Sequence, residues 1–591
     1  MIRKSRIIAT LLVASIATPG GAAYINHDGI GQVALLPYYG VNNNNITNIN
    51  IFNTTNLFKA VKLRFRESRI SADVFNLNLY LSPYDVWNGT IRLNPATGVP
   101  NLITEDESCT LPSSSQLQAG IDFSNSYDAT SNDDLSEGYI EIIEMGVIAD
   151  GPGETNASDG DKYAEIDKSG IADGVISEGD RSITAGLIHG EDGIPLDCTV
   201  IEDAWSAGSV GANINGFESG SLSVDGMATS GSSHDPYDSS LNAGLVYEEQ
   251  DRGGINAYAI LVNIASGAAF VESATHIDGY STLPQHYHIN DSTSSQLPSL
   301  ASGNITQAYM IDEHGGIKNS GTLSLTEWDT GALSDNQPNP STPKGSNPFP
   351  IAVVLSADSV GVPFFTEAGL NGSTEIVATF PMRHHGIYNG SIASNQVDQT
   401  IAKCDGEFND GIDDGASVAI PNLDVTAYDY PSIDGVYCDN AGFIDSVPDV
   451  EVALAYNDYE SQRGALINPN DYLAVNPILI DPLSRSVNVI KIHSAGNAST
   501  SVLGTPVDNA FNWQLDTGFD AGWARILFYG YDYNTDPRIE QLTEINGGIT
   551  DDLGGVWTGV PVIGFTVMTA DVGASQSGEA VDLIRFTNRR Q

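Results

Sequence analysis

The feature that most constrains the fold of this chain is an alternation of apolar and polar residues with a period of two. It is clearest in 48–53, 60–66 and 74–81, and turn-forming residues separate these segments. A period of two places successive side chains on opposite faces of a strand, so the three segments predict an antiparallel meander with one buried and one solvated face. Further strands are predicted at 138–147, 257–270, 351–356, 375–380, 487–493, 523–529 and 560–568.

Composition supports the same fold class. The 60 glycines and 27 prolines favour turns over long helices, and 41% hydrophobic residues are enough for a core. We predict an all-β fold of two antiparallel β-sandwich-like domains with long acidic loops, at 24–335 and 350–591. The proline-rich tract 336–349 is the predicted linker, because it can supply neither ladder donors nor helix. In the alternative, strands cross between the two parts and the tract is only a long loop.

The first 23 residues have the layout of a secretory signal peptide. A basic start is followed by an apolar run at 7–16 and by small residues that end at Ala23. We expect the mature chain to begin near Tyr24 and the protein to be secreted, to the extracellular space or cell surface, with the periplasm as the alternative. We expect no membrane span, because no other apolar run approaches the length of about 20 residues that a span requires.

The charge is strongly negative, since 75 acidic residues oppose 25 basic ones for a formal net charge of −50. Such a surface repels nucleic acid and anionic membranes, which excludes both as partners. It also repels itself unless salt or bound cations screen it, so a saline or divalent-rich environment is expected.

Four cysteines remain after the leader, an even number in a chain expected to be exported. Disulfides are therefore the default, and three pairings are possible. Acidic, loop-rich segments separate neighbouring cysteines, which favours the two sequential bridges Cys109 with Cys198 and Cys404 with Cys438.

Several short phrases lie in order along nearly the whole mature chain: LSPYDVW at 81–87, TFPMR at 379–383, GWAR at 522–525 and GVPVIGF at 559–565, with further pieces at 31–39, 59–67 and 137–141. In these phrases the chain resembles a group of uncharacterised exported β-rich proteins of Gram-negative bacteria. The resemblance implies the fold and export. It implies no catalytic or binding residues.

The densest acidic cluster lies inside the predicted Cys404 to Cys438 loop. Calcium takes six to eight oxygen ligands, and acidic residues interleaved with glycine can fold such oxygens inward. The spacing does not match an EF-hand, so a solvated loop is the favoured interpretation and calcium is the candidate cofactor. The candidate ligands are Asp405, Glu407, Asn409, Asp410, Asp413 and Asp414.

Two histidines, His286 and His288, would share one face of a strand, with His276 and Asp278 shortly upstream. Imidazoles so placed can bind zinc or copper. A loop with exposed histidines is the favoured interpretation, because a proline and a Ser/Thr-rich segment flank the pair.

A run of basic residues is unusual in a chain with so few cations. The run consists of Lys59, Lys62, Arg64, Arg66 and Arg69. One interpretation is cross-strand pairing with local acids such as Glu67 and Asp73. The other is an assembly strip that receives the acidic surface of a neighbouring copy, which would build arrays or filaments.

No catalytic motif is present, so we expect a protein that is not an enzyme. The leading hypothesis is a surface or extracellular-matrix structural protein, such as a self-assembling S-layer-like or filament subunit, with copies of itself or other cell-surface components as partners. The alternative is a secreted calcium- or carbohydrate-binding module with Tyr38, Tyr84 and Trp87 as stacking groups. A secreted hydrolase ranks third.

Overall fold

A computed structural model of the chain describes its two β-rich halves and leaves several connecting segments undescribed. The described residues are 22–69, 71–124, 132–148, 186–199, 201, 252–281, 285, 289, 298–300, 302–303, 305, 307–311, 317–320, 349–357, 359–382, 449–457, 462–466, 483, 485–494, 501–506, 510–515, 520–529, 549–550, 556–558, 560–572, 575–586 and 588–590.

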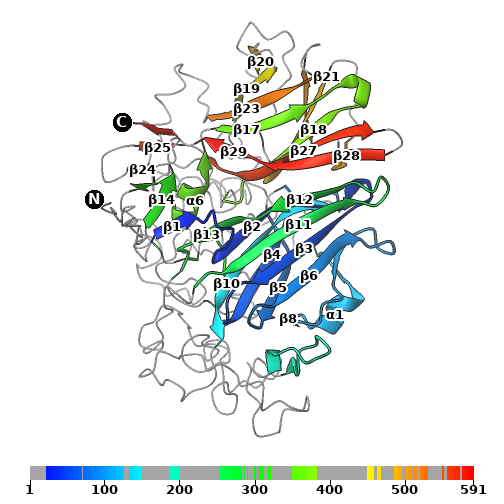
Figure 1. The fold of residues 1–591 in the computed structure, drawn as a ribbon, viewed down its shortest axis with the longest axis vertical. Helices are drawn as coiled ribbons and strands as arrows, with labels where there is room; N and C mark the ends of the chain where they lie inside the picture. Colours follow the sequence, from blue (N-terminus) through cyan, green and yellow to red (C-terminus); the bar gives the residue numbers. More distant parts are fainter. Residues whose placement is uncertain are drawn as a thin grey trace, which may run out of the picture.

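The first half of the chain forms two mainly antiparallel sheets that pack face to face (Figure 1). The nine-stranded sheet has the order β15-β14-β1-β13-β2-β10-β4-β5-β8, and the six-stranded sheet has the order β12-β11-β3-β6-β7-β9. The nine-stranded sheet contains β1 (Ala22–Ile25), β2 (Val33–Gly40), β4 (Phe58–Glu67), β5 (Asp73–Leu81), β8 (Cys109–Leu111), β10 (Glu137–Ile148), β13 (Thr275–Asp278), β14 (Gln307–Ile311) and β15 (Ile317–Ser320). The six-stranded sheet contains β3 (Asn45–Asn53), β6 (Val86–Leu93), β7 (Pro100–Ile103), β9 (Ile121–Asp122), β11 (Ile255–Asn263) and β12 (Ala269–Ser273). The short helices η1 (Asn42–Asn44), α1 (Ser114–Ala119) and α2 (Asn132–Leu135) lie in the connections.

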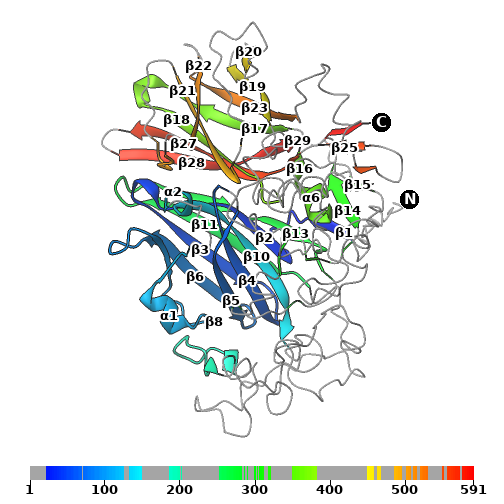
Figure 2. The same ribbon diagram turned by 180° about the vertical axis from the view of Figure 1, so that it is seen from behind.

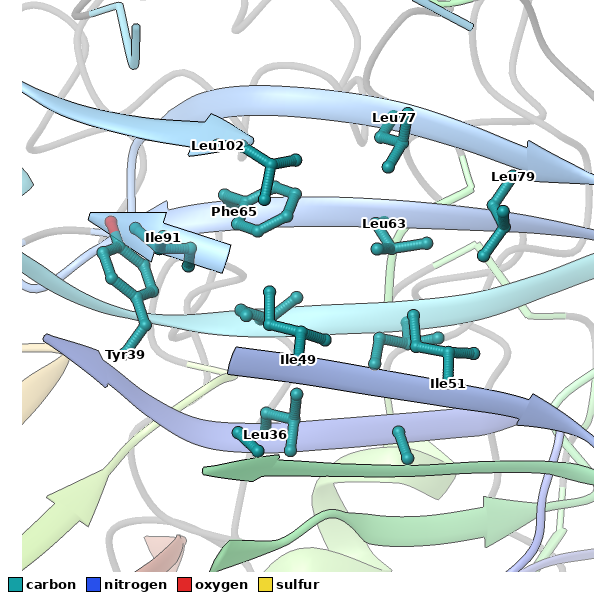
Figure 3. Close-up of a cluster of buried hydrophobic side chains, with 14 of the residues drawn as sticks. Leu36, Tyr39, Ile49, Ile51, Leu63, Phe65, Leu77, Leu79, Ile91 and Leu102 are labelled. Atoms are coloured by element: carbon teal, nitrogen blue, oxygen red, sulfur yellow. The ribbon is translucent and has the colours of Figure 1, made fainter. Parts of the chain in front are cut away.

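The core of this first sandwich comes directly from the period-two alternation. Ile49 and Ile51 of β3 belong to the same buried cluster as Leu63 and Phe65 of β4, which lies in the opposite sheet (Figure 3). Burying one such side chain stabilises the fold by roughly 1.5–3 kcal/mol.

The second half of the chain forms a second sandwich, above the first in Figure 1, from two five-stranded sheets. One has the order β20-β19-β23-β17-β29 and the other β22-β21-β18-β27-β28. Their strands are β17 (Ser359–Phe365), β18 (Ser373–Thr379), β19 (Asp449–Asn457), β20 (Gln462–Leu466), β21 (Val487–Ser494), β22 (Ala510–Leu515), β23 (Ala521–Tyr529), β27 (Ile563–Val572), β28 (Ser575–Asp582) and β29 (Ile584–Phe586). The remaining elements are α6 (Phe349–Leu355), η4 (Ala368–Leu370), β16 (Ser356–Ala357) paired with β26 (Val560–Pro561), and the small sheet of β24 (Ile549–Thr550), β25 (Val556–Thr558) and β30 (Asn588–Arg590).

The sheet that contains β18 and β21 is buried on both faces. Ile376 and Ile490 point into the core of the second sandwich, whereas Val377 and Val489 pack in a cluster with Tyr38 and other residues of the first sandwich. This explains why these strands carry apolar residues at consecutive positions, as strands covered on both sides do. We call the contact between the two sandwiches the seam.

Buried polar contacts also cross the seam. The Thr505 hydroxyl donates to Glu137 Oε1 at 2.6 Å, and the Tyr38 hydroxyl donates to the same oxygen at 3.1 Å. Burial raises the pKa of Glu137, and these hydrogen bonds oppose the rise. Nearby, Asn45 Nδ2 donates to the Val502 carbonyl at 2.8 Å. The seam is thus closed by satisfied polar groups as well as by apolar packing.

An ion pair joins the sandwiches at another point of the seam. Arg485 Nη2 donates to Asp134 Oδ1 at 2.6 Å and to the Ser68 hydroxyl at 2.7 Å. Asp134 lies in α2 of the first sandwich, and its side chain is only 7% exposed. The pair therefore links α2 directly to the second sandwich.

The prediction of an all-β fold is confirmed, because the described chain is mostly antiparallel strand with very little helix. The predicted meander is only partly right. β4 pairs with β5, but β3 pairs with β11 and β6 in the other sheet. Alternation does not distinguish a hairpin from a crossing between two sheets, since both point the apolar residues at the same core. The predicted solvated face is also wrong for β4, whose residues are all buried.

The strand predicted at 351–356 is wrong, because most of this segment is the helix α6. A short continuous apolar run fits a buried helix as well as a buried strand, and Pro350 is compatible with a first helical turn. Ile351 and Leu355 pack in a cluster with Val33 and Leu35 of β2. The helix thus fills the side of the seam (Figure 2).

The ladders fall into two sets, and no described ladder joins a strand before residue 321 to one after 348. The proline-rich tract 336–349 lies outside the described residues except for its last residue, where α6 begins.

The first described strand uses the end of the predicted leader. Ala22 pairs with Gln307 and Ala23 with Ala308, and Ala23 is completely buried. The ladder between β1 and β14 therefore exists only in a chain that keeps these two alanines, which a cut before Tyr24 would remove.

Replacing Arg485 tests how much the seam contributes to stability. We expect R485A to lower the free energy of unfolding by about 2–4 kcal/mol, because it removes the cation that faces the buried Asp134 carboxylate. The measurement is urea denaturation, with R92A as the control, since Arg92 is exposed on β6. Equal denaturation midpoints for R485A and R92A would contradict this role.

Candidate functional site

A cleft of about 570 Å³ lies where the outer side of the first sandwich meets the second. One wall comes from β11, β12, β13 and the segment that follows β1, and the other comes from β27, β28 and β29. The first wall contributes Asn26, His27, Asn256, Tyr258, Val271 and Ser273, and the second contributes Ile563, Asp582, Leu583 and Arg585.

Planar polar side chains face each other across this cleft. Asp582 and Arg585 lie on the second wall, and His27 and Asn256 lie on the first. Partial burial raises the pKa of Asp582 and lowers that of Arg585 to about 10, so the guanidinium stays charged at neutral pH. Asn256 Nδ2 already donates to the Gly29 carbonyl at 2.6 Å. The donors and acceptors offered to a polar ligand therefore come mainly from Asp582, Arg585 and His27.

An aromatic ring forms the edge of the cleft. Tyr258 of β11 stacks on Phe52 of β3, with ring centroids 5.6 Å apart and an interplanar angle of 22°. Both residues are at half-buried positions on the outward face of the six-stranded sheet. The pair gives the cleft a rigid apolar platform beside its polar groups.

His276 also lines the cleft, but its ring is occupied within the fold. The Ala257 amide donates to His276 Nε2 at 3.0 Å, and burial lowers the pKa of the imidazole to about 4. A neutral ring that accepts a backbone hydrogen bond holds β11 against β13. Nε2 is therefore not free for a metal, and His286 and His288 lie outside the described residues.

A second carboxyl lies close to Asp582 across the seam. Glu272 of β12 is only 2% exposed, and its Oε2 has no hydrogen-bond partner among the residues that the structure describes. Burial first, and then the negative charge of Asp582, raise the pKa of Glu272 well above its usual value. The buried carboxyl therefore resists ionisation beside the cleft.

The structure contradicts the assembly strip. Lys59, Lys62, Arg64 and Arg66 are completely buried, and Arg69 is half-buried in the turn after β4. Side chains that reach no solvent cannot receive the surface of a neighbouring copy. The alternation of β4 does separate these cations from the apolar core face, but the face that they occupy is covered.

The cations are neutralised by carboxylates on the two neighbouring strands. Arg64 Nη2 lies 2.9 Å from Asp73 Oδ2, and Arg66 Nε lies 3.3 Å from Glu141 Oε1. Lys59 Nζ lies 2.5 Å from Glu144 Oε1. The interpretation of pairing with local acids is right for Asp73. Glu67 accepts backbone amides of the following turn, from Arg69 and Ala72.

Lys62 differs from its neighbours because Nζ has no hydrogen-bond partner in the described part of the chain. Burial and the adjacent Arg64 lower its pKa to about 7, against the opposing effect of Asp73. A buried amine without a compensating carboxylate is more stable in the neutral form.

A disulfide holds part of the cover over this buried layer. Cys109 of β8 is bonded to Cys198, which confirms the first predicted bridge. Cys109 packs in one cluster with three residues of the segment that carries Cys198: Leu187, Ile188 and Ile201. The bridge therefore fixes this segment against the edge of the nine-stranded sheet.

The remaining predicted sites are not in the part of the chain that is described. Cys404, Cys438 and all six candidate calcium ligands, Asp405, Glu407, Asn409, Asp410, Asp413 and Asp414, lie in the undescribed segment 383–448. Within the described ranges, no three His, Cys, Asp or Glu side chains gather as a metal site would require. No helix in those same ranges combines the length and the apolar character that a membrane crossing demands.

The aromatic residues considered for stacking are mostly core. Tyr38 and Trp87 are 1% and 0% exposed, so neither can contact a ligand from outside. Tyr84 is 68% exposed, but it does not line the cleft.

The chain matches no family model, no curated protein and no solved structure. The resemblance to exported β-rich proteins therefore stays a prediction, and any functional argument depends on the geometry of the cleft.

Sequence reasoning missed the cleft, because its residues come from segments near 27, 258, 273 and 583 and form no motif. One sequence feature could have pointed to it: the alternation in 255–263 places Asn256 and Tyr258 on the same, outward face of the strand. The two walls meet only through packing across the seam.

The two lysines of β4 provide a matched test of the buried layer. Between about pH 7 and 10.5 the unfolded chain holds a proton on Lys62 that the folded chain lacks, so this residue destabilises the fold most at low pH. We expect K62M to raise the free energy of unfolding by about 3 kcal/mol at pH 6.5, with the gain shrinking toward pH 10.

K59M should do the opposite, because it leaves the buried Glu144 without its ion-pair partner, at a cost of about 3–5 kcal/mol. Urea denaturation of both variants at pH 6.5 and 9.5 measures these effects. A K62M variant that is destabilised at both pH values would show that Lys62 is charged and paired.

Proposed function

We propose that the protein is a secreted binding protein, not an enzyme, whose seam cleft binds a neutral carbohydrate. The observation that carries this proposal is the combination of a stacked aromatic platform with converging planar polar groups in one open cleft. The apolar C–H face of a sugar ring packs on an aromatic ring, while its hydroxyls bond to amide, carboxylate and guanidinium groups.

The charge of the site supports a neutral ligand. Asp582 and Arg585 place one carboxylate and one guanidinium on the same wall, so the wall offers both a donor and an acceptor without a strong excess of either sign. The strongly acidic chain would repel an anionic ligand before it reached the cleft.

Binding without turnover is supported by the state of the titratable groups. His276 is neutral and already accepts a backbone amide, so it is not available as a general base. Asp582 is the carboxylate that lines the cleft, whereas Glu272 does not line it. A glycosidase pair needs both carboxyl groups at the scissile bond.

A second candidate is the structural role that the sequence favours. The observation behind it is the rigid seam, where hydrogen bonds and an ion pair join the sandwiches into one block suited to a surface coat. The buried β4 cations cannot mediate its assembly, so contacts between copies would use other surfaces.

The carbohydrate proposal predicts that Y258A and D582A each weaken saccharide binding about tenfold, the loss expected when a stacking ring or a charged hydrogen-bond acceptor is removed. The probes are neutral di- to hexasaccharides of glucose, galactose, mannose and N-acetylglucosamine, measured by isothermal titration calorimetry. E579A is the matched control, because Glu579 is exposed on the same strand as Asp582 but does not line the cleft.

Thermal melting of each variant separates a binding defect from unfolding. Absence of saturable binding by the wild-type protein, or equal binding by D582A, would refute the cleft as a saccharide site. Shortening of the hexasaccharides on incubation would refute the non-enzymatic part of the proposal.

A further inference from the structure

The outward face of the six-stranded sheet continues directly from the cleft. Along β3 and β11 the residues alternate strictly between buried and half-buried, which defines an outward set on each strand. Tyr258, which lines the cleft, belongs to this set. The sheet face therefore begins where the cleft ends.

One row of outward side chains crosses three strands from Tyr258. Tyr258 of β11 is in register with Asn50 of β3, and Asn50 is in register with Asn88 of β6. Neighbouring strands lie about 4.8 Å apart, so the row extends roughly 10 Å from the ring to the second amide. This is longer than a single sugar ring.

The central amide of this row is open to a ligand. Asn50 makes no side-chain hydrogen bond with any other residue that the structure describes, while in the next row the Thr90 hydroxyl donates to Asn48 Oδ1 at 2.6 Å. Asn88 is exposed, and its Nδ2 donates to Asp106 Oδ2 at 3.3 Å, beside its own backbone N–H, which donates to the same oxygen at 3.2 Å. The row that starts at Tyr258 thus keeps the whole amide of Asn50 for a ligand, and at its far end the donors of Asn88 are already engaged.

The face carries little charge. Among the outward positions of the described strands β3, β6, β11 and β12, Arg92 is the only charged side chain, and Asp106, from the segment after β7, adds one carboxylate beside Asn88. On a chain with a net charge of −50, a face with so few charges that carries amides and stacked rings is complementary to a neutral, polyhydroxylated polymer.

We propose that this face is a track for a linear neutral polysaccharide, which enters at the cleft and continues over Tyr258, Asn50 and Asn88. The inference rests on the proposed saccharide site and deepens it. The cleft holds one end of the bound segment, and the amide row holds the sugar units that follow.

The test compares ligand lengths in a variant of the track. For a wild-type protein with a track, affinity for a hexasaccharide exceeds that for the disaccharide of the same sugar by at least tenfold. N50D places a charge on the track with almost no change of shape. It should abolish this length dependence while leaving disaccharide affinity unchanged. N371D is the matched control, because Asn371 is exposed in the second sandwich.

The outcomes separate the two proposals. Equal affinity of the wild-type protein for both lengths would overturn the track and leave the cleft intact. If the wild-type protein bound no saccharide of either length, both the saccharide site in the cleft and the track would be refuted. Sedimentation velocity provides the remaining arm: a concentration-dependent dimer that N50D dissociates would overturn the track, because the face would then bind a second copy.

Discussion

Neutralisation of the β4 cations by carboxylates of the neighbouring strands is the interaction on which the first sandwich depends. Arg64, Arg66 and Lys59 lie on the face of β4 opposite the apolar core, and the chain covers that face as well. A buried charge without a partner costs several kcal/mol, so the cover is possible only because Asp73, Glu141 and Glu144 meet these cations. Tyr280 and the disulfide-bonded segment around Cys198 can then pack over the sheet.

The same principle of covering both faces produces the seam and the cleft. The sheet of β18 and β21 is apolar on both sides, so its outer side must bury itself against the first sandwich. At one end of this contact the edge strand β12 of the first sandwich lies against the edge strand β28 of the second. The two strands contact each other through side chains and share no described ladder. The cleft lies beside this meeting of edges, and it brings Tyr258 and Asp582 to the same space.

Local patterns predicted the strands well and their partners poorly. The alternation in β4 correctly identifies the core residues Val61, Leu63 and Phe65. Every second side chain of a strand points to the same face, so the alternation alone decides which face meets the apolar layer. The alternation does not show whether the opposite face of the strand is solvated, so the burial of the β4 cations could not be predicted from it. It also does not show which sheet β3 joins. For 351–356 the pattern itself was ambiguous, because an apolar run without alternation fits a helix or a strand.

By itself, the sequence determined the β-rich class and the core face of each alternating strand, since these depend on residues near one another. It favoured the pairing of Cys109 with Cys198 among three possibilities, and the structure decided it. Only the tertiary structure decided that Lys62 lies in a closed layer and that Tyr258, Asn256 and Asp582 line one cleft. The physical reason is that burial and convergence arise from packing between segments hundreds of residues apart, and no local pattern of side chains encodes which distant surface will cover them.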